Sequence, residues 1–310
     1  MSKAYGYAAY GGPETEIWFD QPEPAPGPSE LVIAVKAAGV NPVDYKIRNG
    51  AMANPQATPA FPLVLGTEAA GVVLAAGSDV DGFAPGDEVL GKAAPEHGTF
   101  AEHAVLLAED TVSKPPALGF VPAAALPVAG GTAWDVLEKL GVADGETLLI
   151  NGIGGGVGVM AAQLARDRGV AVFGVGSGAK RAMVESLGST LVAYDSGDVV
   201  EQMRSLLPGG VDAILDVIGG EPMRHVAILI TNPARVVSIA DPGVAGLGGT
   251  YLISGMAGVS AVAELVAAGK VDPKVLQTFP FDEAAQALRA VESGHVLGKI
   301  VIDFEQTSRA

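Results

Sequence analysis

Hydrophobic positions in the first third of the chain fall in short runs that are separated by turn residues. We expect a strand in each run, at Glu30–Val40, Ala69–Ala76, Asp87–Gly91 and Thr99–Leu106. Proline- and glycine-rich segments punctuate these runs, and Gln21–Pro28 alone carries four prolines. Short apolar strands between turn signals are typical of a compact β-rich domain.

The pattern changes after Pro116, where a helix is predicted over Val121–Leu140 and strands then alternate with helices. The predicted strands are Thr147–Asn151, Val170–Val175, Leu191–Tyr194, Val211–Val217, Arg235–Ile239 and Tyr251–Ile253. The predicted helices are Val157–Arg168, Ala179–Leu187, Asp198–Leu206, Met223–Ile230 and Val259–Ala268. Repeated βα units with apolar strands predict an α/β fold with a doubly wound parallel sheet.

The last 40 residues return to the first pattern, with a strand at Val275–Phe279, a helix at Glu283–Glu292 and a strand at Ile300–Phe304. The simplest organisation is a nucleotide-binding domain inserted into a β-rich domain. We expect residues 1–119 and 271–310 to form the β-rich domain and residues 120–270 the inserted one. The loop Asn49–Pro62, with three prolines, is long enough to be a functional lid.

A glycine cluster follows the apolar strand Thr147–Asn151 and precedes a predicted helix. Gly152, Gly155 and Gly158 fit the spacing Gly-x-x-Gly-x-x-Gly, with Gly156 and Val157 between them. Glycines here permit a tight turn and let the backbone approach a dinucleotide pyrophosphate at the positive N-terminus of the helix. The alternative is a plain βα turn.

The end of the next strand discriminates between cofactors. NAD-binding proteins usually carry an acidic residue about 20 positions beyond the loop, where it binds a ribose hydroxyl. Here Ser177 stands 19 positions after Gly158, Lys180 and Arg181 follow, and no carboxylate appears before Glu185. A hydroxyl and two cations favour the 2′-phosphate of NADPH. The alternative is that both cations only solvate a helix start.

Composition excludes several classes of protein. With 19 basic and 35 acidic residues in 310, the formal charge is −16, which argues against nucleic acid and anionic membrane surfaces as partners. No cysteine is present, so disulfides, thiolate nucleophiles and cysteine zinc sites are excluded. The first residues do not resemble a signal peptide, and no apolar segment is long enough to span a bilayer. We expect a soluble, cytoplasmic protein.

Several ordered motifs carry a family resemblance. They are Ala-Gly-Val-Asn-Pro-Val-Asp at 38–44, Leu-Gly-Thr-Glu at 65–68, Ala-Gly-Val-Val at 70–73, Gly-Asp-Glu-Val at 86–89, Gly-Thr-Phe-Ala-Glu at 98–102, Gly-Gly-Thr-Ala-Trp at 130–134, the glycine loop at 152–158 and Gly-Lys-Ile-Val at 298–301. On these motifs the chain resembles the medium-chain dehydrogenases/reductases, specifically the zinc-independent quinone oxidoreductases. The resemblance implies a Rossmann domain inserted into a GroES-like, β-rich substrate domain.

The resemblance also implies cofactor contacts beyond the glycine loop. The residues expected there are Thr132 near the nicotinamide, Ser177 and Lys180 at the 2′-phosphate, Tyr194 beside the adenosine, Ile218 and Gly219 after the fourth strand, Ser238, Ile239, Ala240 and Asp241 after the fifth, and Leu252 and Ile253 near the carboxamide. For the apolar members, packing in the core is the alternative.

Departures from the zinc-dependent relatives indicate the chemistry. Asn41 replaces a cysteine ligand and Thr67 a histidine ligand, so no metal is expected. Without zinc, the resemblance implies hydride transfer to a quinone or to the β-carbon of an α,β-unsaturated carbonyl. Asn41, Tyr45 and Thr67 stand where the family lines its pocket, and any of them could donate a hydrogen bond to a substrate oxygen. Either Tyr45 or solvent supplies the proton.

Two other functions share this cofactor signature. One is an enoyl reductase of secondary metabolism, and the other is a non-catalytic NADPH-binding sensor or structural protein. The resemblance and the short apolar segment after Thr250 also favour a homodimer through the nucleotide-binding domain, because an exposed sheet edge invites pairing.

Overall fold

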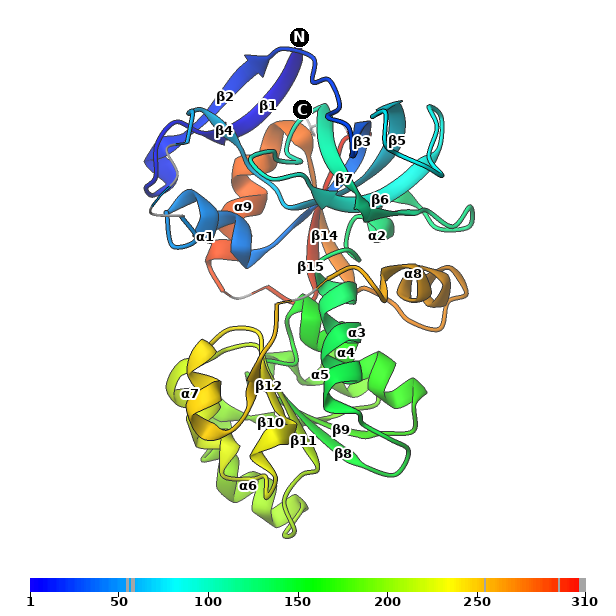
Figure 1. The fold of residues 1–310 in the computed structure, drawn as a ribbon. Coiled ribbons are helices and arrows are strands. Elements are labelled where there is room, and N and C mark those ends of the chain that lie inside the picture. Colours follow the sequence, from blue (N-terminus) through cyan, green and yellow to red (C-terminus); the bar gives the residue numbers. More distant parts are fainter. Residues whose placement is uncertain (54–55, 57–58, 254, 295, 307–310) are drawn as a thin grey trace. The chain divides into compact units, whose positions relative to one another are not determined.

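The structure is a computed structural model that describes residues 1–53, 56, 59–253, 255–294 and 296–306. The chain divides into two compact units, and each is described below by itself. The first comprises residues 1–128, 259–268 and 275–310, and the second comprises residues 129–258 and 269–274. In Figure 1, the first unit runs from blue to teal and includes the orange and red C-terminal segments, whereas the second unit is mostly green and yellow. Among the described residues, no helix combines the length and apolar character needed to cross a bilayer.

The first unit is built on two sheets of mainly antiparallel strands. A three-stranded sheet has the order β2-β1-β4, and a six-stranded sheet has the order β14-β15-β3-β5-β6-β7, in which β3 also pairs with β7. The bounds are β1 Ser2–Tyr7, β2 Glu16–Gln21, β3 Glu30–Val40, β4 Leu63–Val64, β5 Glu68–Ala76, β6 Glu88–Ala93, β7 His103–Ser113, β14 Val275–Pro280 and β15 Lys299–Asp303. The extra pairing of β3 with β7 closes the sheet on itself, as in a small barrel.

Helices of this unit are α1 Pro42–Arg48, α2 Phe120–Ala123, α8 Val259–Ala267 and α9 Ala284–Glu292. Helix α1 starts where Asn41 is extended and Pro42 takes the first helical position, which suits its fixed φ. The Asp44 carboxylate accepts a hydrogen bond from the Asn41 backbone N–H at 2.7 Å, which satisfies an N-terminal donor of the helix. This start positions the residues that follow β3.

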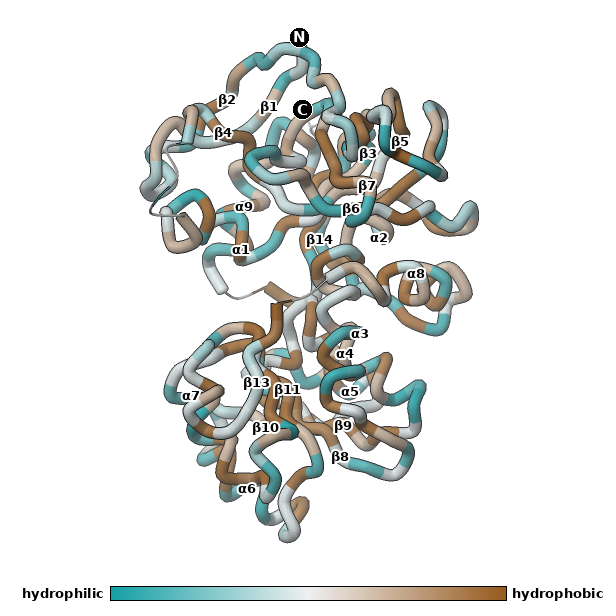
Figure 2. The backbone as a smooth tube through the Cα atoms, in the orientation of Figure 1, coloured by the Kyte–Doolittle hydropathy of each residue, from teal (hydrophilic) through white to brown (hydrophobic). Residues whose placement is uncertain are grey.

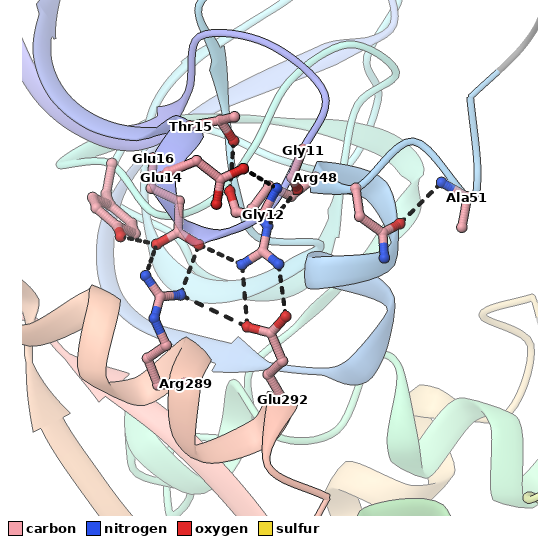
Figure 3. A network of polar contacts seen from close by, with 11 residues as sticks. Gly11, Gly12, Glu14, Thr15, Glu16, Arg48, Ala51, Arg289 and Glu292 are labelled. Carbon is pink, nitrogen blue, oxygen red and sulfur yellow. Dashed lines mark hydrogen bonds and ion pairs between the residues drawn. The ribbon is translucent and has the colours of Figure 1, made fainter.

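A buried ion network fixes the other end of α1 (Figure 3). The Arg48 side chain is 1% exposed and pairs with Glu16 on β2 and, at 2.7 Å, with Glu292 at the end of α9. Arg289 donates two further hydrogen bonds of 2.8 Å to Glu16, and the Tyr5 hydroxyl donates another. The network therefore joins three segments that are far apart in sequence, beside a core that includes Leu31 and Ile33 on β3, Phe100 before β7 and Leu288 on α9.

The second unit contains a six-stranded parallel sheet in the order β10-β9-β8-β11-β12-β13. Its strands are β8 Thr147–Asn151, β9 Ala171–Gly176, β10 Thr190–Ala193, β11 Ala213–Asp216, β12 Val236–Ser238 and β13 Thr250–Tyr251. Its helices are α3 Ala129–Leu140, α4 Gly156–Asp167, α5 Arg181–Ser186, α6 Val199–Leu206 and α7 Gly220–Ala227. This strand order is that of a Rossmann fold.

Helices cover both faces of the parallel sheet, with α3 and α4 packed together and α6 and α7 packed together (Figure 1). The central strands are therefore buried on both sides, and Leu148, Leu149 and Ile150 of β8 have no exposed surface. Figure 2 shows the corresponding apolar colour along β11 and its neighbours. The predicted α/β fold, a Rossmann domain inserted into a GroES-like domain, is confirmed.

One predicted helix is wrong. The segment Val121–Leu140 forms two helices, α2 and α3, with a break before Val128. Pro127 has no N–H to donate, and the Val128 N–H donates to the Glu68 carboxylate at 2.7 Å instead of to a helical carbonyl. The division into units places residues 120–128 and α8 with the first unit, whereas the sequence analysis assigned both to the inserted domain.

Four of the described strands and α-helices were not predicted, namely β1, β2, β4 and α1. The signal for α1 was present, since Asn41, Pro42 and Asp44 have the residue types of a helix start. Of the predicted lid Asn49–Pro62, residues 54–55 and 57–58 lie outside the described part of the chain.

Candidate functional site

The glycine loop lies between β8 and α4, at the carboxyl end of the sheet. Gly152 has φ of +96°, a conformation that side chains disfavour, and Gly158 is so close to the loop that a Cβ would lie 2.6 Å from the Cα of Ile153. At Gly155, by contrast, the nearest atom to a Cβ would be the Gly152 oxygen at 3.9 Å. A tight turn, an open position and a closely packed helix start are what a dinucleotide pyrophosphate requires. The residues present therefore fit such a cofactor.

The strand ends beside this loop are joined by a buried carboxylate. Asp216, at the end of β11, accepts hydrogen bonds of 2.7 Å from the Asn151 side chain and 2.6 Å from the Ser238 hydroxyl, and one of 3.0 Å from the Gly219 N–H. The Ser238 Oγ in turn accepts from the Asp241 N–H at 3.1 Å. Asp216 thus aligns the ends of β8, β11 and β12, a role that the sequence analysis missed although an acid ending an apolar strand was visible.

Other predicted cofactor residues cluster at these same strand ends. Gly219 has φ of +77°, Ile218 is 54% exposed, and the Ile239 N–H donates to the Asp216 carbonyl at 3.0 Å, with Ala240 directly after it. Asp241 accepts from the N–H groups of Gly220 and Gly243, which lowers the pKa of its carboxyl group. The apolar exposure of Ile218 favours a ligand contact over core packing.

The remaining predicted contacts are distributed over the same unit. Thr132 is buried on α3, Tyr194 after β10 is 60% exposed, and Ile253 after β13 is 85% exposed. Leu252 is half-buried, and its N–H donates to the Ser238 carbonyl at 3.0 Å. An isoleucine and a tyrosine with this much exposed surface are not core residues, so the packing alternative does not apply to these two.

The end of β9 carries the predicted 2′-phosphate residues. Ser177 is the N-cap of a short 3-10 helix, and the Lys180 side chain runs along the glycine loop, where a Cβ on Gly154 would overlap it. Burial lowers the pKa of the Lys180 ammonium group. Arg181 is exposed and pairs with Glu185 one turn later at 3.1 Å. The two predicted cations therefore differ in their surroundings. The Lys180 side chain lies against the glycine loop, whereas the Arg181 side chain pairs with Glu185.

A carboxylate that the sequence analysis did not consider also lies at this strand end. Asp195, just after β10, accepts the Gly178 N–H with both oxygens at 3.0 Å. Asp195 lies outside the segment that follows β9 in sequence, and it reaches this strand end from β10 because β9 and β10 are paired and parallel.

In the first unit, two of the three predicted pocket residues, Asn41 and Thr67, belong to a polar cluster that is largely buried. The Asn41 amide donates to Glu68 at 2.7 Å and its oxygen accepts from the Lys299 ammonium at 2.6 Å, while Lys299 also pairs with Glu68 at 2.7 Å. Glu68 is completely buried and Lys299 is nearly so. A charge removed from water needs a partner, and here each charge has one together with hydrogen bonds.

Thr67 and Asp44 extend this cluster toward α1. The half-buried Thr67 hydroxyl donates to the completely buried Asp44 carboxylate at 3.0 Å. Burial raises the pKa of Asp44 to about 7, although hydrogen bonds from Asn41 and Thr67 and the charge of Lys299 act against this rise. The structure thus brings Asn41 and Thr67 together through Asp44, whereas Tyr45 on α1 packs against the apolar core. Among the described residues, no three histidine or acidic side chains gather as metal ligands would.

Comparison with known proteins identifies the family. Residues 27–116 match the alcohol dehydrogenase GroES-like domain, and residues 187–302 match the zinc-binding dehydrogenase domain. The mitochondrial NAD(P)H oxidoreductase RTN4IP1 of Homo sapiens is 33% identical to this chain, over 89% of the chain and 82% of that protein. The chain is a medium-chain dehydrogenase/reductase.

Within this superfamily the protein belongs to the zinc-independent quinone oxidoreductase branch. The quinone oxidoreductase of Coxiella burnetii superposes with a TM-score of 0.87 at 29% identity, covering 98% of this chain and 99% of that one. The 2-methylene-furan-3-one reductase of Solanum lycopersicum is 31% identical, over 97% of this chain and 78% of that protein. The predicted family is therefore confirmed, and this medium-chain reductase is an oxidoreductase of an NAD(P)H-binding family.

Proposed function

We propose that the protein is an NADPH-dependent, zinc-independent reductase of quinones or α,β-unsaturated carbonyl compounds. The observation that carries this proposal is the Rossmann unit, whose glycine loop and Asp216-aligned strand ends fit a dinucleotide. When bound, the nicotinamide cofactor supplies a hydride to an electrophilic carbon. The names of the Coxiella burnetii and Solanum lycopersicum relatives support a quinone or an enone as the acceptor.

In the substrate domain, we assign Asn41, Tyr45 and Thr67 to the pocket. Both ends of the Asn41 amide are already bonded to Glu68 and Lys299, which suits a positioning role better than a substrate contact. Thr67 is the residue of this cluster that keeps partial exposure, so it is our choice for the donor to a substrate oxygen as negative charge develops there, with its O–H turning from Asp44 to the substrate. Tyr45 or solvent supplies the proton.

The acceptor class can be tested with a panel of substrates. Purified protein should oxidise NADPH with 1,4-benzoquinone or simple enones. Ethanol and benzyl alcohol should not be oxidised, because Asn41 and Thr67 stand in place of the metal ligands that a zinc-polarised hydroxyl group would need. Preference for an enoyl thioester would favour the enoyl reductase alternative. The 2-methylene-furan-3-one reductase keeps this alternative relevant, because it is a relative named for a conjugated C=C bond. Cofactor binding without turnover of any acceptor would favour the non-catalytic alternative.

Metal independence follows from Asn41 and Thr67 at the positions where zinc-dependent relatives have ligands. Activity should survive dialysis against EDTA, and elemental analysis should find much less than one zinc per chain. One tightly bound zinc, lost together with activity, would contradict the proposal.

We propose a preference for NADPH over NADH of at least about tenfold, equivalent to roughly 1.4 kcal/mol. Ser177 and the Lys180 ammonium against the glycine loop support it, because a phosphate beside Lys180 offsets the cost of its burial. Lys180→Ala should weaken NADPH binding and leave NADH binding nearly unchanged. The exposed Lys139→Ala serves as a control of equal charge change, and equal affinities of the wild type for both cofactors would reject the preference.

The remaining assignments concern partners and location. We propose a small-molecule substrate and a homodimer. We propose no nucleic acid or membrane partner, because the formal charge of −16 disfavours binding to anionic surfaces. A reducing, cytoplasmic location is proposed because the chain has no cysteine.

A further inference from the structure

Asp195 lies beside the strand end that carries Ser177 and Lys180, the predicted 2′-phosphate residues. Its two carboxylate oxygens accept the same N–H, that of Gly178, at 3.0 Å each. Gly178 directly follows Ser177, which comes after the last residue of β9 and is the N-cap of the short 3-10 helix. The side chain of Asp195 is exposed, so both oxygens keep lone pairs for a further donor.

Within the part of the chain that the structure describes, neither Lys180 nor Arg181 forms an ion pair with Asp195. Arg181 pairs with Glu185 on its own helix. The Lys180 side chain runs along Gly154 in the glycine loop. The end of β9 therefore presents one cation at the loop and one carboxylate at the 3-10 helix, rather than the two cations that the sequence indicated.

We propose that Asp195 is a specificity-determining residue that opposes the 2′-phosphate of NADPH and accepts a hydrogen bond from the ribose hydroxyls of NADH. This inference rests on the proposed function, because it assumes that the Rossmann unit binds NAD(P)H. A carboxylate repels a phosphate and accepts from a hydroxyl, as the acidic residue after the second strand does in NAD-binding Rossmann proteins. In this protein the acid follows β10, the third strand of the parallel sheet in chain order. Lys180 therefore raises the affinity for a 2′-phosphate, whereas Asp195 lowers it.

The test uses Asp195→Asn, because the asparagine oxygen can still accept the Gly178 N–H while the charge is removed. Dissociation constants of NADPH, NADH, 2′,5′-ADP and 5′-AMP are measured by calorimetry on the full chain, for the wild type and the variant. Asp212→Asn is the matched control, since Asp212 is exposed and also accepts a backbone N–H, that of Thr147 at 2.8 Å, before β11 rather than after β10.

The expected result is a rise in NADPH and 2′,5′-ADP affinity on the order of five- to tenfold, since a unit charge a few ångströms from the phosphate is removed. NADH and 5′-AMP affinities should stay the same or fall by up to about threefold, and Asp212→Asn should match the wild type. Asp195→Ala should give the same change of ratio even if losing the Gly178 bond weakens every ligand.

An unchanged ratio of NADH to NADPH affinity in both Asp195 variants would overturn the inference, including the case in which all four ligands weaken in parallel. That result leaves the proposed function intact, because the wild type still binds its cofactor. Failure of the wild type to bind any of the four ligands would instead overturn the proposed function and the inference with it.

Discussion

Asp44 is a carboxylic acid without exposed surface, and its environment makes folding stability depend on pH. Burial raises its pKa from 3.8 to about 7, so the folded protein holds the proton more tightly than the unfolded chain does. The resulting stabilisation is complete below about pH 4 and is lost as the pH rises through about 7; a shift of this size corresponds to at most about 4 kcal/mol.

Asp44→Asn should remove this dependence, because the amide cannot ionise. Urea unfolding midpoints are measured from pH 4 to 8. As the pH rises, the midpoint of the wild type should fall relative to that of the variant. The exposed Asp81→Asn should follow the wild type at every pH. Parallel curves for the wild type and Asp44→Asn would show that Asp44 does not titrate in this range.

The Tyr45 hydroxyl is the other residue-scale question, because Tyr45 or solvent supplies the proton in the proposed reaction. Tyr45→Phe should lower kcat for 1,4-benzoquinone by less than about tenfold if solvent is the donor, since the ring keeps its packing against the core. A loss of about a thousandfold would make Tyr45 a general acid, because such catalysis typically contributes 10²–10⁴. Steady-state kinetics with saturating NADPH distinguish the two outcomes.

At the scale of elements, α1 is anchored by buried polar side chains of its own, Asp44 near its start and Arg48 at its end, and Figure 3 shows the partners of Arg48. Arg48→Met leaves Glu16 and Glu292 with fewer partners, and breaking a buried ion pair typically costs about 3–5 kcal/mol. The urea midpoint should fall accordingly. Arg204→Met, an exposed position on α6, should stay within about 0.5 kcal/mol. Equal midpoints for both variants would mean that α1 does not depend on Arg48.

The break between α2 and α3 shows where the apolar pattern of the sequence fails to predict the bounds of a helix. The apolar pattern of Val121–Leu140 favours one helix, yet Glu68, more than 50 residues earlier, accepts the Val128 N–H at the break. The buried strands β3 and β8, by contrast, have the predicted bounds Glu30–Val40 and Thr147–Asn151. Buried strands show their pattern locally, whereas the break also reflects a long-range contact.

For the whole molecule, the sheet order predicts how copies associate. Strand β13 is at the edge of the parallel sheet, Tyr251 on it is 38% exposed and Ile253 beyond it is 85% exposed. An edge with exposed apolar side chains favours pairing with its own copy. Light scattering at micromolar concentration should give about twice the chain mass of 31.2 kDa. Tyr251→Lys should shift the protein toward the monomer, and Leu206→Lys should not; a wild-type mass near 31.2 kDa would reject the dimer.

The amino-acid sequence determined the fold class, the glycine loop and the family, because each depends on residues that are neighbours along the chain. Apolar strands repeat with helices between them, and Gly152, Gly155 and Gly158 belong to one loop, so their meaning can be recognised without coordinates. The same holds for Asn41 and Thr67 at the places of metal ligands.

Tertiary structure decided which polar groups meet. Lys299 reaches Asn41 and Glu68 across more than 200 residues, Asp216 joins three strand ends, and Asp195 reaches the Gly178 N–H from the neighbouring strand. No local pattern carries these contacts, because a charged or amide side chain looks the same in sequence whether water or a buried partner satisfies it. Only strand order and register bring the partners within hydrogen-bond distance, and that distance determines their charge state and role.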